Sequence, residues 1–384
     1  MDALMLPLNW QRVRLGDIAE IKRGASPRPI ENPKWFCTNS NVGWVRISDI
    51  SKNSRFLYKT AQKLSKKGIE KSRFIKQNSL IMSMCATIGK PIITKIDTCI
   101  HDGFVVFENP KIDLNYLYYF LCYIEKEWLE SGQQGSQVNL NVDLIKNKEV
   151  FYPKDLNEQI AIANILSDLD CYLCSLDALI LKKESVKKAL SFELLSQRKR
   201  LKGFNQNWQR VRLGDILSYE QPTKFLVATT QYLQKGFTPI LTAGKTFILG
   251  YTNDKHGIYT NIPVIIFDDF TTDSKMVNFP FKVKSSAIKI LSLRDNNQAD
   301  LKYIYEKLTL LKHQVTDHKR YWIDEFSNFE ILLPPLNEQI AIANILSDLD
   351  HEIISLKNKK RQFENIKKAL NHDLMSAKIR VLNK

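Results

Sequence analysis

The sequence predicts a mixed α/β protein in which two globular α+β domains are joined by two long antiparallel helices that form a coiled coil. The first observation is an internal repeat: NWQRVRLGDI at 9–18 returns unchanged at 207–216, and LNEQIAIANILSDLD at 156–170 returns unchanged at 336–350. The second is the spacing of apolar residues from 162 and from 342 onward, which alternates between three and four positions. A tandem duplication with pseudo-twofold symmetry accounts for both.

The repeat divides the chain into four parts. Residues 1–155 form a first globular domain, 156–202 a long helix, 203–335 a second globular domain and 336–384 a second long helix. A length of 384 residues suits two domains of ordinary size. The stretches between the repeated markers, 19–155 and 217–335, differ in length and share no obvious similarity. We call the repeated segments, 9–18 with 156–170 and 207–216 with 336–350, the two frames, and the stretches between them the two inserts. The two frames are near-identical, whereas the two inserts differ.

The first insert predicts short strands and one helix. Residues 44–50 and 79–84 are β-rich runs bounded by turn residues, and 114–129 carries apolar residues at helical spacing. Residues 52–76 contain nine basic side chains and a single acidic one, Glu70, in a chain of net charge +15. Such an excess favours a phosphate-binding surface, with a plain solvated surface as the alternative.

The first long helix follows the first insert. We expect Asn157 to cap it, and Gly203 to follow its end. About 42 residues give a length of roughly 60 Å. Because only 202–206 separate this helix from the second NWQRVRLGDI, the second long helix should run back along the first.

The second insert predicts strands at 263–267 and 287–293 and a helix at 301–313. Its tempting catalytic motifs fail. A phosphate-binding loop ending at Thr246 would need glycine where Pro239 stands, and Asp268, Asp269 and Asp273 are typical of a solvated turn. The basic and aromatic segment 318–322 is either a surface loop or a DNA contact. We predict no catalytic residue and no metal site in the chain.

Two sets of binding residues follow from these patterns. The repeated spans contain more apolar residues than one helix seam uses, so a partner helix could cover the remainder, unless the helix pair and the adjacent domain bury it all. The predicted partner-binding residues are Gln159, Ile160, Ile162, Ile165, Gln339, Ile340, Ile342 and Ile345. The predicted DNA-binding residues are Arg46, Arg55, Lys59, Lys63, Lys66, Lys67, Lys71, Arg73, Lys76, Lys90, Lys245, Lys275, Lys319 and Arg320.

The compartment can also be anticipated. No apolar run approaches the ~20 residues of a membrane span, and the first residues lack a secretory pattern. Six scattered cysteines, including Cys171 and Cys174 on the predicted helix, lack the pattern of a disulfide scaffold. We expect a cytoplasmic protein with reduced thiols and no membrane partner.

Several motifs together resemble one known family. WQRVRLGDI before each insert, GWVRISDI at 43–50, CATIGKP at 85–91, GSQVNLN at 135–141 and the LNEQIAIANILSDLD boundary are similar to the DNA-specificity subunit of type I restriction-modification enzymes. The resemblance covers nearly the whole chain. It weakens in the second insert, which has HKRYWIDEF in place of GSQVNLN.

The resemblance implies a non-catalytic subunit that reads a bipartite asymmetric site on double-stranded DNA. Each insert would be a target-recognition domain, and the helices would act as a spacer that docks two methyltransferase subunits and, in a restriction complex, two motor subunits. It implies no cofactor in this chain: S-adenosylmethionine would belong to the methyltransferase, and ATP and Mg²⁺ to the restriction subunit. The alternatives are an orphan sequence-specific DNA-binding protein and a coiled-coil scaffold whose basic charge is incidental.

Overall fold

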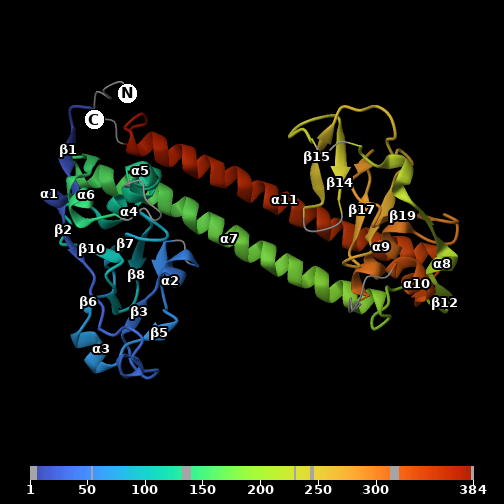
Figure 1. The fold of residues 1–384 in the computed structure, drawn as a ribbon, viewed down its shortest axis with the longest axis horizontal. Helices are drawn as coiled ribbons and strands as arrows, with labels where there is room; N and C mark the ends of the chain where they lie inside the picture. Colours follow the sequence, from blue (N-terminus) through green and yellow to red (C-terminus); the bar gives the residue numbers. More distant parts are fainter. Residues whose placement is uncertain are drawn as a thin grey trace. The chain divides into compact units, whose positions relative to one another are not determined.

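A computed structural model describes residues 7–52, 55–131, 140–228, 231–242, 246–311 and 320–381. The chain divides into two compact units (Figure 1): unit 1 comprises residues 1–176 and 359–384, and unit 2 comprises 177–358. Helices α7 (Leu156–Leu195) and α11 (Leu336–Met375) each have 40 residues, and each helix is divided between the two units. In the described part of the chain, no helix combines the length and apolarity that crossing a membrane requires.

The ends of the long helices differ from the expectation. The carboxylate of Asp155 accepts a hydrogen bond from the backbone N–H of Asn157 at 2.9 Å, so Asp155, not Asn157, caps α7. Both helices end earlier than predicted, in the same left-handed turn, at Gln197 (φ 64°) and Ala377 (φ 58°). Gly203 lies beyond this turn and is not the helix stop.

Within unit 1, the first half of α7 packs antiparallel against the second half of α11. Asp170 is paired with Lys367, and the rings of Tyr172 and Phe363 lie 4.6 Å apart. Beyond the end of α11, Arg380 donates a hydrogen bond to Glu158 at 2.9 Å. Partner numbers on α11 fall as those on α7 rise. The chain directions are therefore opposite, as predicted.

Within unit 2, the other halves of the two helices pack in the same way. Lys187 of α7 pairs with Asp350 of α11 at 2.6 Å, and Arg200, which lies beyond the end of α7, pairs with Glu338 of α11 at 2.6 Å. Asp170 and Asp350 are repeat counterparts, as are Lys187 and Lys367. The duplicated sequence thus makes one ion pair twice, once in each unit.

In the described part of unit 1, two of the sheets have more than two strands. The five-stranded sheet has the order β2-β10-β7-β8-β4 and the four-stranded sheet the order β5-β3-β9-β6. The strands are β2 (Glu20–Arg23), β3 (Gly43–Val45), β4 (Phe56–Leu57), β5 (Gln62–Lys63), β6 (Arg73–Ile75), β7 (Leu80–Ser83), β8 (Pro91–Thr94), β9 (Thr98–Ile100) and β10 (Phe104–Glu108). The helices are α2 (Ile47–Ser51), α3 (Lys66–Glu70), α4 (Leu114–Tyr123), α5 (Glu125–Ser131) and α6 (Val142–Asn147), with a 3-10 turn η1 (Pro33–Trp35).

Unit 2 has a four-stranded sheet of order β13-β19-β16-β17 and a three-stranded sheet of order β15-β14-β18. Its strands are β13 (Leu217–Glu220), β14 (Thr238–Leu241), β15 (Ile248–Thr252), β16 (Val264–Asp268), β17 (Ser274–Val277), β18 (Lys282–Val283) and β19 (Ile288–Leu293). Helices α9 (Leu301–Leu310) and α10 (Tyr321–Asp324) and the 3-10 turns η2 (Pro222–Phe225) and η3 (Phe326–Asn328) complete it. The order β13-β19-β16-β17 reproduces β2-β10-β7-β8, so inserts without sequence similarity share one core topology.

The repeated marker WQRVRLGDI builds the same corner in each unit. Strand β1 (Trp10–Arg14) pairs antiparallel with β11 (Glu149–Pro153), and β12 (Gln209–Arg212) pairs with β20 (Glu330–Leu333). The turns α1 (Leu15–Ile18) and α8 (Leu213–Ile216) follow. A Cβ on Gly16 would lie 3.2 Å from Lys146 of α6, and one on Gly214 would lie 3.0 Å from Ser327 of η3. The segment after HKRYWIDEF therefore packs where the segment after GSQVNLN packs, despite the different sequence.

Two predicted elements need correction. Residues 44–50 are not one strand: β3 ends at Val45, and α2 begins at Ile47 because the Asp49 carboxylate accepts the N–H of Arg46 at 2.9 Å. The helix predicted at 114–129 is two helices, α4 and α5, separated at Ile124. Strands at 79–84, 263–267 and 287–293 are confirmed as β7, β16 and β19, with ends within two residues of the prediction.

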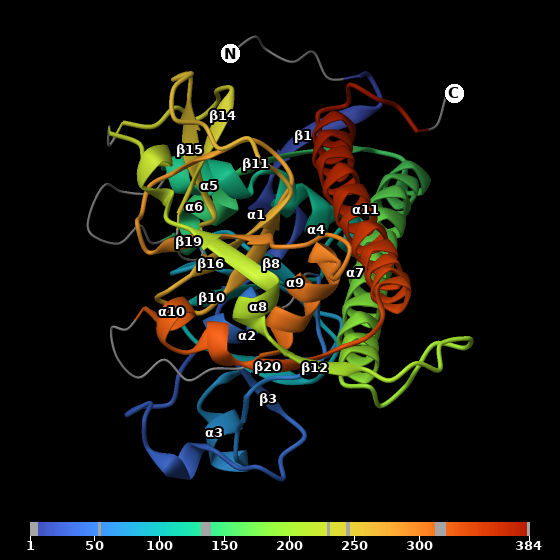
Figure 2. The ribbon, with the colours of Figure 1, turned by 90° about the vertical axis from the view of Figure 1, so that its right-hand side faces the viewer.

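In each unit, a shorter helix, α4 or α9, lies between the larger sheet and the long helices. In unit 1, the Tyr119 hydroxyl of α4 donates to Asp170 of α7 at 2.6 Å. In unit 2, Lys302 of α9 donates to Asp350 of α11 at 2.9 Å, and α9 packs on β16 and β17 (Figure 2). Helices α4 and α9 thus join each sheet to the frame.

Candidate nucleic-acid interface

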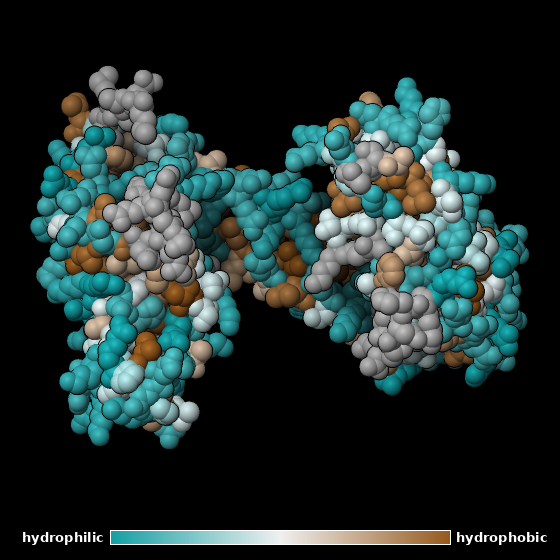
Figure 3. All heavy atoms as spheres, in the orientation of Figure 1, coloured by the Kyte–Doolittle hydropathy of each residue, from teal (hydrophilic) through white to brown (hydrophobic). Residues whose placement is uncertain are grey.

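The basic segment 52–76 does not form one helical face. Its described residues run through β4, β5, α3 and β6, and the surface around α3, at the lower left of Figure 3, is predominantly hydrophilic. Seven of the predicted DNA-binding residues are exposed in or near this segment: Arg46, Lys59, Lys63, Lys66, Lys67, Lys71 and Lys76. They stay predictions, and their exposure leaves them free to meet a phosphate backbone.

Arg55 is different, and its assignment to DNA is corrected. Its side chain is buried, with 6% of the residue exposed, and its guanidinium donates to Asn115 at 2.6 Å, Tyr119 at 2.9 Å and Ser167 at 2.6 Å. It also lies over the ring of Phe56. A guanidinium committed in this way cannot turn outward without leaving buried polar groups unpaired, so Arg55 joins the domain to α4 and α7.

Two other predicted residues of unit 1 have partners of their own. Arg73 is half-buried, and its Nε donates to the backbone carbonyl of Arg23. Lys90 is also half-buried, and its charge opposes the rise in the pKa of Glu125 that burial causes. Both stay predictions for DNA contact, with fewer free donors than the exposed lysines.

A cleft of about 360 Å³ opens beside these residues. Its lining comes from the end of β2, from the loop after β7, from the turn between β9 and β10, and from the segment that leads into α6: Arg23, Met84, Cys85, His101, Asp102, Gly103 and Leu140. Cys85 belongs to the CATIGKP motif and Leu140 to GSQVNLN, two motifs that the sequence separates by some fifty residues. The fold brings them to one place.

Close backbone contacts hold the rim of this cleft. A Cβ on Gly24 would lie 2.0 Å from the carbonyl oxygen of His101, and one on Gly103 would lie 2.7 Å from the Cys85 sulfur. The N–H of Gly24 donates to the carbonyl of Phe104 at 2.8 Å. Backbone atoms leave no room for a side chain at Gly24, and a side chain at Gly103 would displace His101 or Cys85, so the loop after β2 is fixed directly on the turn between β9 and β10.

Asp102 organises the charges at the rim. Its carboxylate accepts from the Ser26 hydroxyl at 2.9 Å and from Arg28 at 3.1 Å, and its carbonyl accepts from the Nε of Arg23 at 2.7 Å. Burial opposes its ionisation, but the hydrogen bonds to its carboxylate from Ser26 and from its own backbone, together with the charge of Arg28, hold its pKa below the ordinary value. Asp102 is therefore an ionised residue whose carboxylate binds Arg28 and whose backbone carbonyl binds Arg23.

His101 is neutral beside this carboxylate. Burial lowers its pKa, the charge of Asp102 opposes the shift, and the positive charge of Arg46 adds to it. Its Nδ1 accepts the N–H of Gly103 at 2.9 Å, which leaves the proton of the neutral ring on Nε2.

Arg23 and Arg28 were missed by the sequence analysis. Both are exposed, and both lie outside the dense basic run on which that analysis relied. The available signal was the segment RGASPRP at 23–29, in which two arginines flank a glycine and a proline. Only strand pairing places it beside 101–103, some eighty residues later.

In unit 2 the predicted DNA-binding residues are dispersed. Arg320 is exposed, and Lys275 is half-buried with its amino group 4.5 Å from the ring centre of Phe247. Lys245 and Lys319 lie outside the described residues. Asp268 and Asp269 serve the fold: Asp268 accepts from Thr271 at 2.8 Å, and Asp269 pairs with Lys289 at 3.0 Å and accepts the N–H of Trp322 at 2.9 Å.

Four of the predicted partner-binding residues are structural instead. Gln159 is buried, accepts the N–H of Asp113 at 2.8 Å and donates to the carbonyl of Pro153 at 2.9 Å. Gln339 makes the matching bonds to Asp300 at 2.9 Å and to Pro334 at 2.7 Å. Ile162 and Ile342 are buried in the cores of units 1 and 2. These residues attach each domain to its helix and offer nothing to a partner.

The remaining members of that set lie on an exposed surface. Ile160 and Ile340 are 38% and 40% exposed, and Ile165 and Ile345 are half-buried. Ile160 and Ile340 each lie at helical spacing from exposed polar residues of the same helix. We call each such group a frame stripe: Asn157, Ile160, Asn164 and Asp168 on α7, and Asn337, Ile340, Asn344 and Asp348 on α11. The two frame stripes are identical in sequence and are exposed in the same way.

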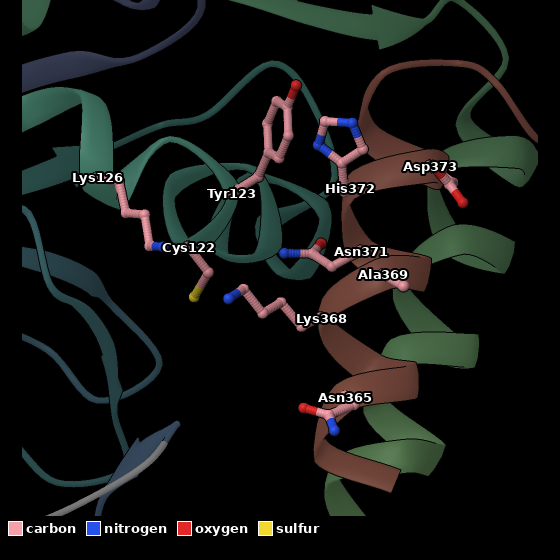
Figure 4. A pocket seen from close by; sticks show the side chains of 9 residues that line it. All are labelled: Cys122, Tyr123, Lys126, Asn365, Lys368, Ala369, Asn371, His372 and Asp373. Carbon is pink, nitrogen blue, oxygen red and sulfur yellow. The ribbon is translucent and has the colours of Figure 1, made fainter. Parts of the chain in front are cut away.

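Each unit also has a groove of about 540 Å³ between its domain helix and a long helix. In unit 1, Tyr123 of α4 faces His372 of α11 with ring centres 5.5 Å apart, and Lys126 and Lys368 point into the groove near Cys122 (Figure 4). In unit 2 the lining is mostly apolar, from Phe192, Leu195, Leu310 and Leu311. Because the two linings differ, they do not suit one shared ligand as the frame stripes do.

Comparison with known proteins places these features in a family. The family model for the type I restriction modification DNA specificity domain matches residues 7–183 and 205–365. The EcoR124I/EcoR124II specificity subunit of Escherichia coli is 46% identical over 166 residues, which cover 42% of this chain and 39% of that protein. The MjaIX specificity subunit of Methanocaldococcus jannaschii is 23% identical over 424 residues, covering 98% of this chain and 95% of that protein.

Solved structures share the fold. The S subunit of a type I restriction-modification system from M. genitalium has a TM-score of 0.64 at 16% identity, covering 96% of this chain and 98% of that chain. A chain from a structural study of complex assembly in the type I R-M system has a TM-score of 0.56 at 14% identity, covering 96% and 98%. The predicted arrangement of two mixed α/β domains and long helices is confirmed as that of this fold.

Proposed function

Since the chain belongs to the type I restriction-modification DNA specificity family, we propose that it is the DNA-recognition subunit of a methyltransferase complex. It reads a bipartite asymmetric site on double-stranded DNA, one half with each unit. It contributes recognition and not catalysis. Where a restriction subunit is present, the same chain sets the target of the restriction complex.

The observation that carries this proposal is one core topology that presents two different surfaces. The order β2-β10-β7-β8 in unit 1 matches β13-β19-β16-β17 in unit 2, yet the side chains on the inserts are unrelated. Base sequence is read by side chains, whereas the shared backbone sets only how they are presented. Two such surfaces read two different half-sites, which makes the whole site asymmetric.

The frame stripes support methyltransferase partners, and we propose two copies, one on each frame stripe. From 156 to 170 and from 336 to 350 the repeats agree at exposed as well as buried positions, whereas from 171 and 351 onward the helices differ at exposed positions such as Cys174 and Ile354. Packing alone constrains buried positions. Identity that extends to exposed positions fits one protein bound twice.

The cofactors follow from this division of labour. S-adenosylmethionine belongs to the methyltransferase partner, and ATP and Mg²⁺ to the restriction-motor subunits, of which two would join the complex. This chain would then contribute no cofactor ligand.

The test is a stoichiometry measurement on the full chain co-expressed with a methyltransferase subunit of a type I restriction-modification system from the same organism. Native mass spectrometry should find two methyltransferase subunits on the wild type, one on Ile160→Asp or Ile340→Asp, and none on the double variant. Ile354→Asp, at a 55% exposed position outside the frame stripes, is the matched control and should keep two. Two subunits on the double variant would contradict the docking proposal, and no association with the wild type would favour an orphan DNA-binding protein.

A further inference from the structure

Resting on the proposed DNA recognition, we propose that Arg23 and Arg28 are base-reading residues of unit 1 and that they read guanine. The half-site of unit 1 then contains two G·C pairs, one for each arginine, contacted through the major groove. Asp102, which accepts a hydrogen bond from each arginine, is the positioning residue that orients their side chains.

Arg23 is fixed at both its backbone and its side chain. It ends β2, its carbonyl accepts from Arg73, and its Nε donates to the carbonyl of Asp102 at 2.7 Å. Among the described residues, its two Nη groups have no hydrogen-bond partner. A guanidinium anchored through Nε presents its two Nη donors side by side, at the outer edge of a fixed plane.

Among the described residues, Arg28 makes one side-chain hydrogen bond. Its Nη2 donates to the Asp102 carboxylate at 3.1 Å, and 72% of its side chain is exposed. The carboxylate also accepts from Ser26 of the same loop. Gly24, which no larger residue could replace against His101, keeps this loop on the turn that carries Asp102. The loop position of both arginines and the side-chain plane of Arg23 are thus set before DNA arrives, and Asp102 directs Arg28 toward the same place.

The central carboxylate argues for a base edge and against a phosphate. A phosphate bound between Arg23 and Arg28 would lie beside the ionised carboxylate of Asp102. The two negative charges would repel each other and weaken phosphate binding. A base edge carries no net charge and meets no such penalty. The exposed lysines of 59–76 have no carboxylate of this kind in their midst except Glu70, and they suit phosphates better.

Guanine is the base that paired donors select. In the major groove it offers two adjacent acceptors, N7 and O6, which match two parallel N–H groups. Adenine offers one acceptor and one donor at that edge, thymine offers one acceptor and a methyl group, and cytosine offers a donor. An arginine whose two free donors point outward therefore discriminates for guanine.

The test uses Arg23→Lys and Arg28→Lys in the full chain, each probed with duplexes that carry a randomised central segment. Lysine keeps the charge but cannot donate in a bidentate fashion, so a phosphate contact survives the change and guanine reading does not. Each variant should lose about 5- to 150-fold of its preference for guanine at one position of the half-site read by unit 1. Asp102→Asn should weaken the preference at both positions while the unchanged arginines keep some of it.

The matched control is Arg12→Lys. Arg12 is half-exposed in the same unit, on β1, where it pairs with Glu149. This variant should keep the selected sequence of the wild type, and thermal melting should show all four variants folded. The half-site of unit 1 is identified as the half that is unchanged when residues 217–335 are exchanged for those of a relative.

The outcomes separate the two proposals. If the wild type selects no sequence, the proposed recognition function fails. If it selects a bipartite site whose unit 1 half has fewer than two G·C pairs, or if Arg23→Lys and Arg28→Lys keep the guanine preference, recognition stands and the assignment of Arg23 and Arg28 is overturned.

Discussion

Replacing Lys63, Lys66, Lys67 and Lys71 together with alanine should weaken binding to every DNA sequence. All four side chains are exposed around α3, and three of them belong to or directly follow that helix. A lysine that contacts a phosphate displaces about one counterion, and each lost contact lowers the slope of log K against log salt by about 0.9. Four lost contacts lower it by about 3.6, which corresponds to a loss of roughly 10³-fold or more at 0.1 M salt.

Fluorescence anisotropy over a salt series, with a selected duplex and a scrambled one, measures this directly. Both duplexes should lose affinity equally, because phosphates are the same in every sequence. The control replaces Lys111, Lys146 and Lys154, which are also exposed in unit 1 but lie near the frame, and its slope should match that of the wild type. An unchanged slope in the quadruple variant would remove these lysines from the interface. A loss confined to the selected duplex would show that they read bases.

Three further predictions concern modularity and stability. Exchanging residues 19–155 for the matching segment of a relative should change one half of the selected site and preserve the other; loss of both halves would show that recognition is not divided between the units. Gln159→Leu or Gln339→Leu should lower the free energy of unfolding by about 2–6 kcal/mol, because a buried N–H and a buried carbonyl lose their partners at about 1–3 kcal/mol each. Urea melts should show less than about 0.5 kcal/mol for the exposed control Gln362→Leu, and an equally small effect of the buried changes would refute the attachment role. Burial lowers the pKa of Lys307 from 10.5 to about 8, so between these values the unfolded chain binds more protons and unit 2 should gain stability as the pH rises. The melts of Lys307→Met should lack that part of the gain, and identical pH profiles would show that Lys307 titrates normally.

The frame was predictable because its signals are local and are present twice. The three- and four-residue spacing after Ile162 and Ile342 required two long helices, and the short link after the first helix required antiparallel packing. The mixed inserts were predictable only as a class. The helix break at Ile124 and the turn from β3 into α2 depend on neighbours that a local pattern does not contain.

The candidate interface was predicted in part, and the misses have one cause. Counting basic residues found Lys63, Lys66, Lys67 and Lys71, which the structure leaves exposed, but it also included Arg55, which is buried against α4 and α7. Charge density along a sequence does not tell an outward-facing cation from one that pairs inside. Arg23 and Arg28 were passed over because they are sparse in sequence.

The sequence by itself determined the duplication, the two long helices and the membership of a family, since repeats, helical periodicity and motifs are carried by residues close together in the chain. Only the tertiary structure decided which repeated residues are free: Gln159 and Ile162 face inward, while Ile160 faces outward on the same helix. It alone also placed Arg23 and Arg28 around Asp102. The physical reason is that β2 reaches 101–103 through pairing with β10, and this contact joins residues some eighty positions apart that no local pattern relates.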